Sequence, residues 1–154
     1  MDERPQRFTE AIVEMLHQAG WRSGRDVMAT VQLPRGFRLF PAAARVLAEF
    51  GNLRMGRHGP GLEMARRTVR IDPMLALGEN EEFAQVETVI GRALYPLGEI
   101  NEGQAFLAID EQGRTFIVGD LLLYVDANFD DALDRLLTGK SAVRIDTDEP
   151  WSGV

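Results

Sequence analysis

Four carboxylates in the second half of the chain, Glu99, Glu102, Asp110 and Glu111, are of a type and spacing that could support acid/base chemistry. General acid/base catalysis needs a pocket and a carboxyl pKa moved toward the working pH. The sequence gives no sign that any of the four side chains is buried or perturbed. We therefore interpret them as part of a solvated acidic surface.

The sequence contains no complete motif for metal binding or thiol chemistry. The chain has no cysteine, which excludes disulfides, thiolate zinc sites and cysteine nucleophiles. Its two histidines, His17 and His58, form no paired zinc motif. The segment Asp126–Asp130 resembles the start of a calcium loop but lacks the glycine and the final glutamate of that loop. We interpret Asn128 as a helix cap, followed by acids that favour the helix N-terminus.

Phosphate and nucleophile motifs are incomplete. Gly139-Lys140-Ser141 matches the end of a phosphate-binding loop, but the first glycine of that motif falls on Asp134 and a helix is predicted before it. The serines lack a nucleophile elbow, and the chain has no dinucleotide fingerprint. The sequence thus favours a binding module with no catalytic residue, metal or cofactor. A small enzyme assembled from scattered carboxylates and arginines remains an alternative; its arginines would be Arg25, Arg66 and Arg70.

Periodicity indicates which elements would position these residues. Apolar spacings of three and four predict helices at residues 6–19, 42–50, after the cap residue Asn80, and at 129–137. Extended patterns predict a hairpin over 53–71, in which Leu62 and Met64 take part, and strands at 105–109, 115–118, 121–125 and 142–145. The segment Tyr95–Glu99 is predicted to break the third helix. This order predicts an α+β fold with helices packed on a largely antiparallel sheet.

Length and composition predict one domain. The 154 residues are 45% hydrophobic, and we expect a single domain over 1–154, with a core from about 6 to 145 and a loose tail after Asp146. No apolar run approaches the length of a membrane span, and the N-terminus does not resemble a signal peptide. We therefore expect a cytoplasmic protein without a membrane partner.

The net charge of −7 is unevenly distributed. Residues 1–77 carry 12 basic against 8 acidic side chains, whereas residues 78–154 carry 5 against 16. This split can mean little once both halves fold together, or it can give an acidic face suited to a basic partner. The arginines are scattered and lack interleaved aromatics, so direct nucleic-acid binding is not expected.

A series of landmarks along the chain resembles the SUKH superfamily of bacterial immunity proteins, specifically its third subfamily. The landmarks, in order, are Gly20-Trp21, Gly24-Arg25, Phe50-Gly51-Asn52-Leu53, Asp72-Pro73-Met74-Leu75-Ala76, Tyr95-Pro96-Leu97-Gly98-Glu99, Leu107-Ala108-Ile109-Asp110 with Gly113 and Phe116, and Ala132-Leu133-Asp134-Arg135-Leu136-Leu137-Thr138-Gly139. Most are turn residues, and their joint order over residues 8–139 is what carries the resemblance.

The resemblance implies a non-enzymatic α+β domain that binds and neutralises a cognate toxin of a polymorphic toxin system, with a nuclease or a nucleic-acid deaminase as the expected toxin. A general interaction scaffold or regulatory module with the same fold is the alternative. We expect toxin contacts on acidic loops, at Glu99, Glu102, Asp120, Asp126, Asp130, Asp131 and Asp134.

The landmarks themselves are expected to serve turns and core packing, although Tyr95–Glu99 could also be a binding edge. The structural landmarks are Trp21, Gly24, Arg25, Gly51, Asp72, Pro73, Pro96, Gly98, Gly113 and Gly139.

Overall fold

The computed structural model describes residues 7–153. Within them the chain forms four α-helices, seven strands and two short 3-10 helices. The helices are α1 (Glu10–Ala19), α2 (Pro41–Phe50), α3 (Asn80–Ile90) and α4 (Phe129–Thr138), and the 3-10 helices are η1 (Met28–Thr30) and η2 (Pro73–Ala76). The strands are β1 (Arg54–Met55), β2 (Val69–Ile71), β3 (Leu94–Ile100), β4 (Ala105–Asp110), β5 (Thr115–Val118), β6 (Leu122–Asp126) and β7 (Val143–Arg144).

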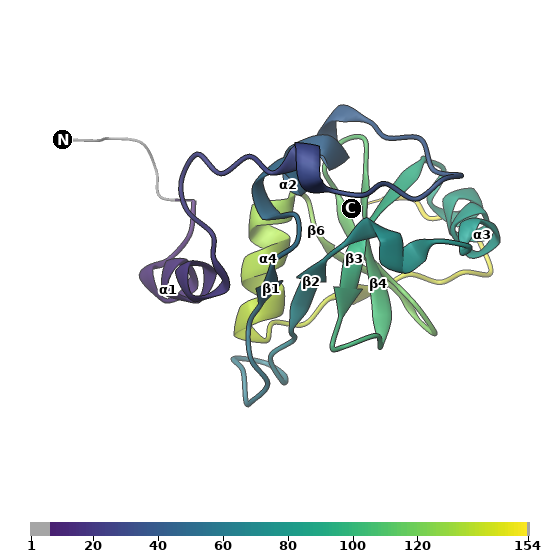
Figure 1. Ribbon diagram of the computed structural model, residues 1–154. Helices are drawn as coiled ribbons and strands as arrows, with labels where there is room; N and C mark the ends of the chain where they lie inside the picture. Colours follow the sequence, from purple (N-terminus) through teal and green to yellow (C-terminus); the bar gives the residue numbers. More distant parts are fainter. Residues whose placement is uncertain (1–6, 154) are drawn as a thin grey trace.

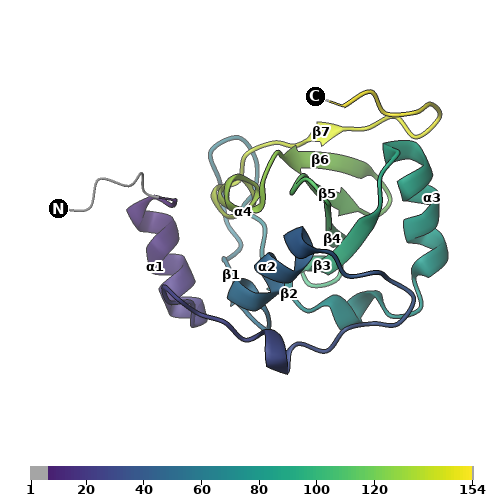
Figure 2. The same cartoon turned by 90° about the horizontal axis from the view of Figure 1, so that it is seen from above.

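The strands form one antiparallel sheet whose spatial order equals their order in the sequence. Figure 1 shows α1 and α3 at opposite sides of the molecule. In Figure 2 the sheet curls, with α2 and α4 on its inner side and α3 outside. The prediction of an α+β domain with helices packed on a largely antiparallel sheet is confirmed.

Both faces of the sheet are buried at its centre, at β4 and β5. Successive side chains of a strand point to opposite faces, and each face there meets a different core. Leu107, Ile109 and Ile117 join the larger core with α1, α2 and α4. Ala108 and Phe116 join the smaller core with α3. Strands β4 and β5 are therefore largely apolar on both sides. The exception at the end of β4 is Asp110, which is fully buried and binds Arg114, so its assignment to a solvated acidic surface is wrong.

Strand β3 corrects the prediction that Tyr95–Glu99 merely breaks a helix. Helix α3 ends at Ile90 with Gly91 in the left-handed conformation, and the predicted breaker lies inside a central strand. A bulge between Pro96 and Gly98 makes Leu97 an extra residue opposite β4. A Cβ on Gly98 would lie 1.8 Å from the carbonyl oxygen of Arg70, so β2 can approach β3 there only if no side chain is present.

The helix ends follow local chemistry, with two corrections. Helix α1 begins at Glu10 after the cap residue Thr9; the predicted first residue, Gln6, lies outside the described residues. Asn80 lies inside α3 instead of capping it. For α4 the prediction is confirmed, because the side chain of Asn128 accepts a hydrogen bond from the backbone N–H of Asp131 at 2.9 Å.

The loop from residue 56 to 68 differs from the predicted extension of the hairpin. It closes over the C-terminal end of α4, where the backbone N–H of Leu62 donates to Thr138 at 2.9 Å. Arg67 is 5% exposed, and its guanidinium donates to the carbonyl oxygen of Lys140 at 3.0 Å. Burial lowers the pKa of Arg67. The negative end of the α4 dipole helps to offset the cost of burying this cation.

The segment after Asp146, predicted to be loose, packs on the sheet. The Trp151 ring lies 5.4 Å from that of Phe116 and 5.5 Å from that of Tyr124, measured between centroids. The guanidinium of Arg114 lies 4.9 Å from the centre of the Trp151 ring. A large aromatic side chain thus gives an otherwise polar segment enough apolar contact to dock.

The landmark residues lie at caps, turns and strand crossings. Arg25 donates to the carbonyl oxygens of Glu49 and Gly51, at 2.7 and 2.8 Å, and so ties the segment after α1 to the end of α2. Asp72 caps η2 by accepting from the backbone N–H of Met74, and Pro73 is buried. Left-handed backbone occurs at Gly24, Gly113 and Gly139. Of the helices that the structure describes, none is both long enough and apolar enough to cross a bilayer.

Replacing Gly98 with alanine should destabilise the fold more than replacing Gly91. At Gly98 the new methyl group meets the backbone of β2, so the strands must separate, and we expect a loss of roughly 3 kcal/mol or more. At Gly91 the new Cβ would have no non-neighbouring atom within 4 Å. The loss there comes only from the left-handed backbone conformation, which costs about 1–2 kcal/mol for a residue with a side chain. Urea unfolding of both variants measures the difference. Equal losses would contradict a steric requirement at Gly98.

Candidate functional site

The seven predicted contact carboxylates fall into two groups. Asp126, Asp130, Asp131 and Asp134 lie on α4 or just before it. Glu99, Glu102 and Asp120 lie at the end of β3, in the β3–β4 turn and in the β5–β6 turn. These two turns lie at the same end of the sheet, because β3 to β6 are consecutive antiparallel strands.

Each carboxylate of the α4 group has a partner inside the chain. Asp130 accepts two hydrogen bonds from Arg7, at 2.8 and 2.9 Å, and Asp131 accepts one from the side chain of Asn128 at 2.9 Å. The other two form ion pairs: Asp126 with Arg135 at 3.3 Å, and Asp134 with Lys140 at 3.1 Å. A binding partner would have to compete with these contacts.

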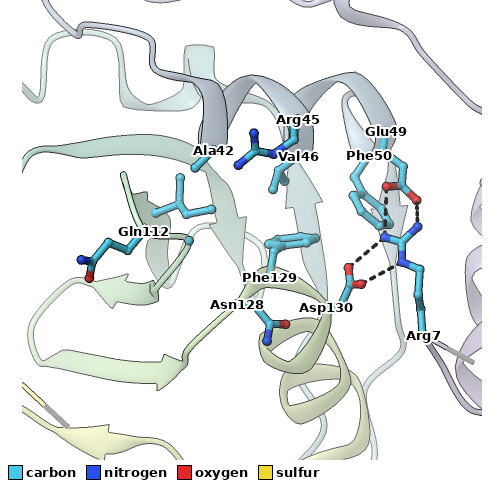
Figure 3. Close-up of a pocket in the computed structure, with 12 residues that line it drawn as sticks. Arg7, Ala42, Arg45, Val46, Glu49, Phe50, Gln112, Asn128, Phe129 and Asp130 are labelled. Carbon is cyan, nitrogen blue, oxygen red and sulfur yellow. Dashed lines mark hydrogen bonds and ion pairs between the residues drawn. The ribbon is translucent and has the colours of Figure 1, made fainter. Parts of the chain in front are cut away.

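The Arg7 contact ties three segments together beside a hollow of about 340 Å³ (Figure 3). Its guanidinium binds Glu49 of α2 as well as Asp130 of α4, and the indole N–H of Trp21 also donates to Glu49, at 2.9 Å. Both carboxylates raise the pKa of Arg7. The charges of Arg7, Glu49 and Asp130, joined by dashed lines in Figure 3, are matched within the chain, so this cluster holds the N-terminal segment against the core.

The second group lies beside a hollow of about 360 Å³, which we call the acidic hollow. Three carboxylates line it: Glu82 from the first turn of α3, Glu99 from β3 and Asp120 from the β5–β6 turn. Its apolar lining comes from η2, β4 and β5, and consists of Leu75, Ala105, Phe106 and Val118. Its remaining lining residues are Gly103, Gln104 and Gly119, so none of the described residues that line it is basic.

Glu82 is the one carboxylate of the acidic hollow that the sequence does not single out. Burial is the main cause that raises the pKa of Glu82, and the negative charges of Glu79 and Asp120 raise it further. Glu82 is thus held at a site where its ionised form is disfavoured. The only signal for it in the sequence is its position in the first turn of a helix, where an acid is ordinarily explained by the helix dipole.

Glu99 and Glu102, at the same end of the sheet, each have one weak ion-pair partner. Glu99 lies 3.9 Å from Arg70, which also pairs with Asp72 at 3.4 Å. Glu102 lies 3.2 Å from the imidazole of His58, and both side chains are mostly exposed. The exposed Glu102–His58 pair contributes little to stability, so a binding partner can replace His58 at low cost. Glu99 is more buried, but its contact with Arg70 is long and Arg70 is shared with Asp72.

A neighbouring hollow of about 440 Å³ extends the acidic surface. Asp120 lines both hollows, and Asp146 and Asp148 line the second one together with Arg144. Leu121, between them in the β5–β6 turn, is 48% exposed. We define the acidic face as Glu82, Glu99, Asp120, Asp146 and Asp148.

The three arginines of the alternative enzyme site do not line the acidic hollow. Two of them bind other groups of the chain, and the third lies in another part of the fold. Arg25 donates to backbone carbonyls, and Arg70 shares Asp72 and Glu99. Arg66 lies in the loop over the end of α4, and its Nε is buried without a hydrogen-bond partner in the described part of the chain. Among residues 7–153, no three side chains of metal-ligating type are placed to hold an ion.

The fold and this surface define an α+β domain whose main charged feature is an acidic face beside a small hollow. The chain belongs to the SUKH-3 immunity protein family, because the family model matches residues 8–139. That membership confirms the resemblance drawn from the landmarks and supports an immunity function. No curated protein and no solved structure matches the chain.

The raised pKa of Glu82 predicts a pH-dependent gain in stability for Glu82→Gln. A carboxylate with a raised pKa in the folded state destabilises that state as pH rises through this pKa, and has no such effect at low pH, where it is protonated. We expect a gain of a few degrees in Tm at pH 8 that disappears at pH 3. Thermal unfolding at the two pH values measures it.

Glu81→Gln is the matched control. Glu81 is an exposed acid in the same first turn of α3, so both substitutions lose the same interaction with the helix dipole. If the two variants respond identically to pH, the raised pKa of Glu82 is contradicted.

Proposed function

We propose that this protein is a non-enzymatic immunity protein that binds and neutralises a cognate toxin of a bacterial polymorphic toxin system. The observation that carries the proposal is the family match over residues 8–139. The proposed toxin is a nuclease or a nucleic-acid deaminase, and the proposed place of binding is the cytoplasm of the producing cell.

The acidic face supports this choice of toxin. Enzymes that act on nucleic acids hold the phosphate backbone with lysine and arginine, so their substrate grooves are basic. A surface that carries Glu82, Glu99 and Asp120 without a lining cation is complementary to such a groove. Complementary charge speeds the encounter and selects the partner. In the proposed mechanism the domain occupies the groove and excludes the nucleic acid.

The contacts inside the chain rank the predicted residues. Glu99, Glu102 and Asp120 lie at the end of the sheet where carboxylates have weak partners or, for Asp120, none among the described residues. Asp126, Asp130 and Asp134 already neutralise arginine or lysine side chains of the chain. We therefore propose the acidic face, with Glu102 at its border, as the principal contact surface.

The proposed function predicts that the protein rescues cells from the toxin domain encoded beside its gene. The experiment is co-expression of the two proteins, with survival of the host as the readout. Survival is expected with this protein and not with an empty vector. Continued killing, with both proteins present in the soluble fraction, would reject the immunity function and favour a scaffold role.

Reversing the charge of the acidic face should weaken protection. In Glu82→Lys/Asp120→Lys, attraction becomes repulsion, and we expect the association rate with the toxin to fall at least tenfold at low salt. The matched control is Glu10→Lys/Glu14→Lys, which places new positive charges on the exposed side of α1, at the opposite side of the molecule (Figure 2). Equal effects of the two variants would reject the acidic face as the contact surface.

A further inference from the structure

The acidic hollow combines an apolar floor with a charged rim. Phe106 is half-buried, and its ring lies 5.7 Å from that of Phe83, so the floor is anchored in the smaller core. Leu75 and Ala105, both partly exposed, complete the apolar surface, and Val118 lies beneath it, 1% exposed. The carboxylates of Glu82 and Asp120 reach the same hollow from two other elements. A ligand that fills this space must therefore be apolar along part of its length and cationic at its end.

The rim needs a cation that the chain does not supply. Glu79 and Asp120 repel the charge of Glu82, and no described basic side chain lines the hollow. Glu99 is shared with Arg70, which lies on its other side beside a separate small hollow. Where the structure describes side chains, none are grouped closely enough to ligate a metal ion. The rim thus fits a larger, extended cation.

We infer that the acidic hollow is a socket for a single arginine side chain of the toxin, with the aliphatic stem on Leu75 and Ala105 and the guanidinium between Glu82, Glu99 and Asp120. The inference rests on the proposed function and specifies the chemistry of the partner at that site. Arginine fits better than lysine because its planar group can bind several separated carboxylates at once and can stack on the ring of Phe106.

A titration with a small probe tests the socket without the toxin. The backbone amide spectrum of the whole protein is followed by NMR while N-acetyl-arginine amide is added. Saturable shifts are expected at Gln104, Phe106 and Gly119, in the millimolar range that suits one side chain. N-acetyl-lysine amide should bind more weakly, and N-acetyl-citrulline amide, of similar shape but uncharged, should not bind. The absence of saturable shifts in the hollow, or equal binding of citrulline, would overturn the inference.

Two variants connect the probe to the named side chains. Glu82→Gln/Asp120→Asn removes two charges from the rim and should weaken probe binding about tenfold or more. Phe106→Leu keeps an apolar floor but removes the ring, and should reduce the preference for arginine over lysine. Glu14→Gln/Glu81→Gln is the control of equal charge, since both residues are exposed and neither lines the hollow, and should bind the probe as the unaltered protein does. If the rim variant also binds normally, the socket is overturned.

The toxin then separates the socket from the proposed function. If the unaltered protein protects cells and Glu82→Gln/Asp120→Asn binds the toxin at least tenfold more weakly, the socket is supported. If the rim variant binds the toxin as tightly as the unaltered protein, the socket is overturned while the immunity function stands. If the unaltered protein does not protect, the proposed function fails, and the probe titration still reports whether the hollow binds arginine.

Discussion

The close approach of β2 to β3 at Gly98 is the constraint on which the rest of the structure depends. The bulge beside it turns both Leu97 and Ile100 toward the larger core, and so adapts a seven-residue strand to a strongly curled sheet. The same crossing joins the basic first half of the chain to its acidic second half. Arg70 and Glu99 face each other across it, and the hairpin β1–β2 becomes continuous with the meander β3–β7.

The acidic second half of the chain gives an acidic surface in the folded molecule, but only some of its carboxylates contribute to that surface. Near α4, basic side chains of the chain pair with the acids there: Arg7 binds Asp130, and Lys140 binds Asp134. At the other group the acids share an apolar hollow and repel one another. The acids near α4 are thus neutralised within the chain, whereas those of the acidic hollow are not all neutralised by the described residues. The net charge alone does not distinguish the two groups, because it does not show which carboxylates have a partner.

The sequence predicts the elements whose signals are local. The strands β4 to β6, the cap at Asn128 and the end of α4 at Gly139 follow from apolar runs and turn residues. Strand β3 does not, because proline and glycine ordinarily interrupt a strand, and only pairing with β2 and β4 makes Pro96 and Gly98 acceptable. The docked tail likewise depends on a distant aromatic surface around Phe116. Acidity alone names Glu99 and Asp120, whereas Glu82 joins them only through the tertiary arrangement of α3 and two turns.

The meander has a kinetic consequence. From β3 onward every strand pairs with its immediate neighbour in the sequence, and most of the connections are short turns. Folds with short-range contacts close small loops at low entropic cost and fold quickly. Under the proposed function, the protein binds a toxin made in the same cell, so its folding time matters as well as its affinity. The locally paired strands β3 to β6 are therefore expected to form first, as the frame on which the more distant helices and the β1–β2 hairpin then dock.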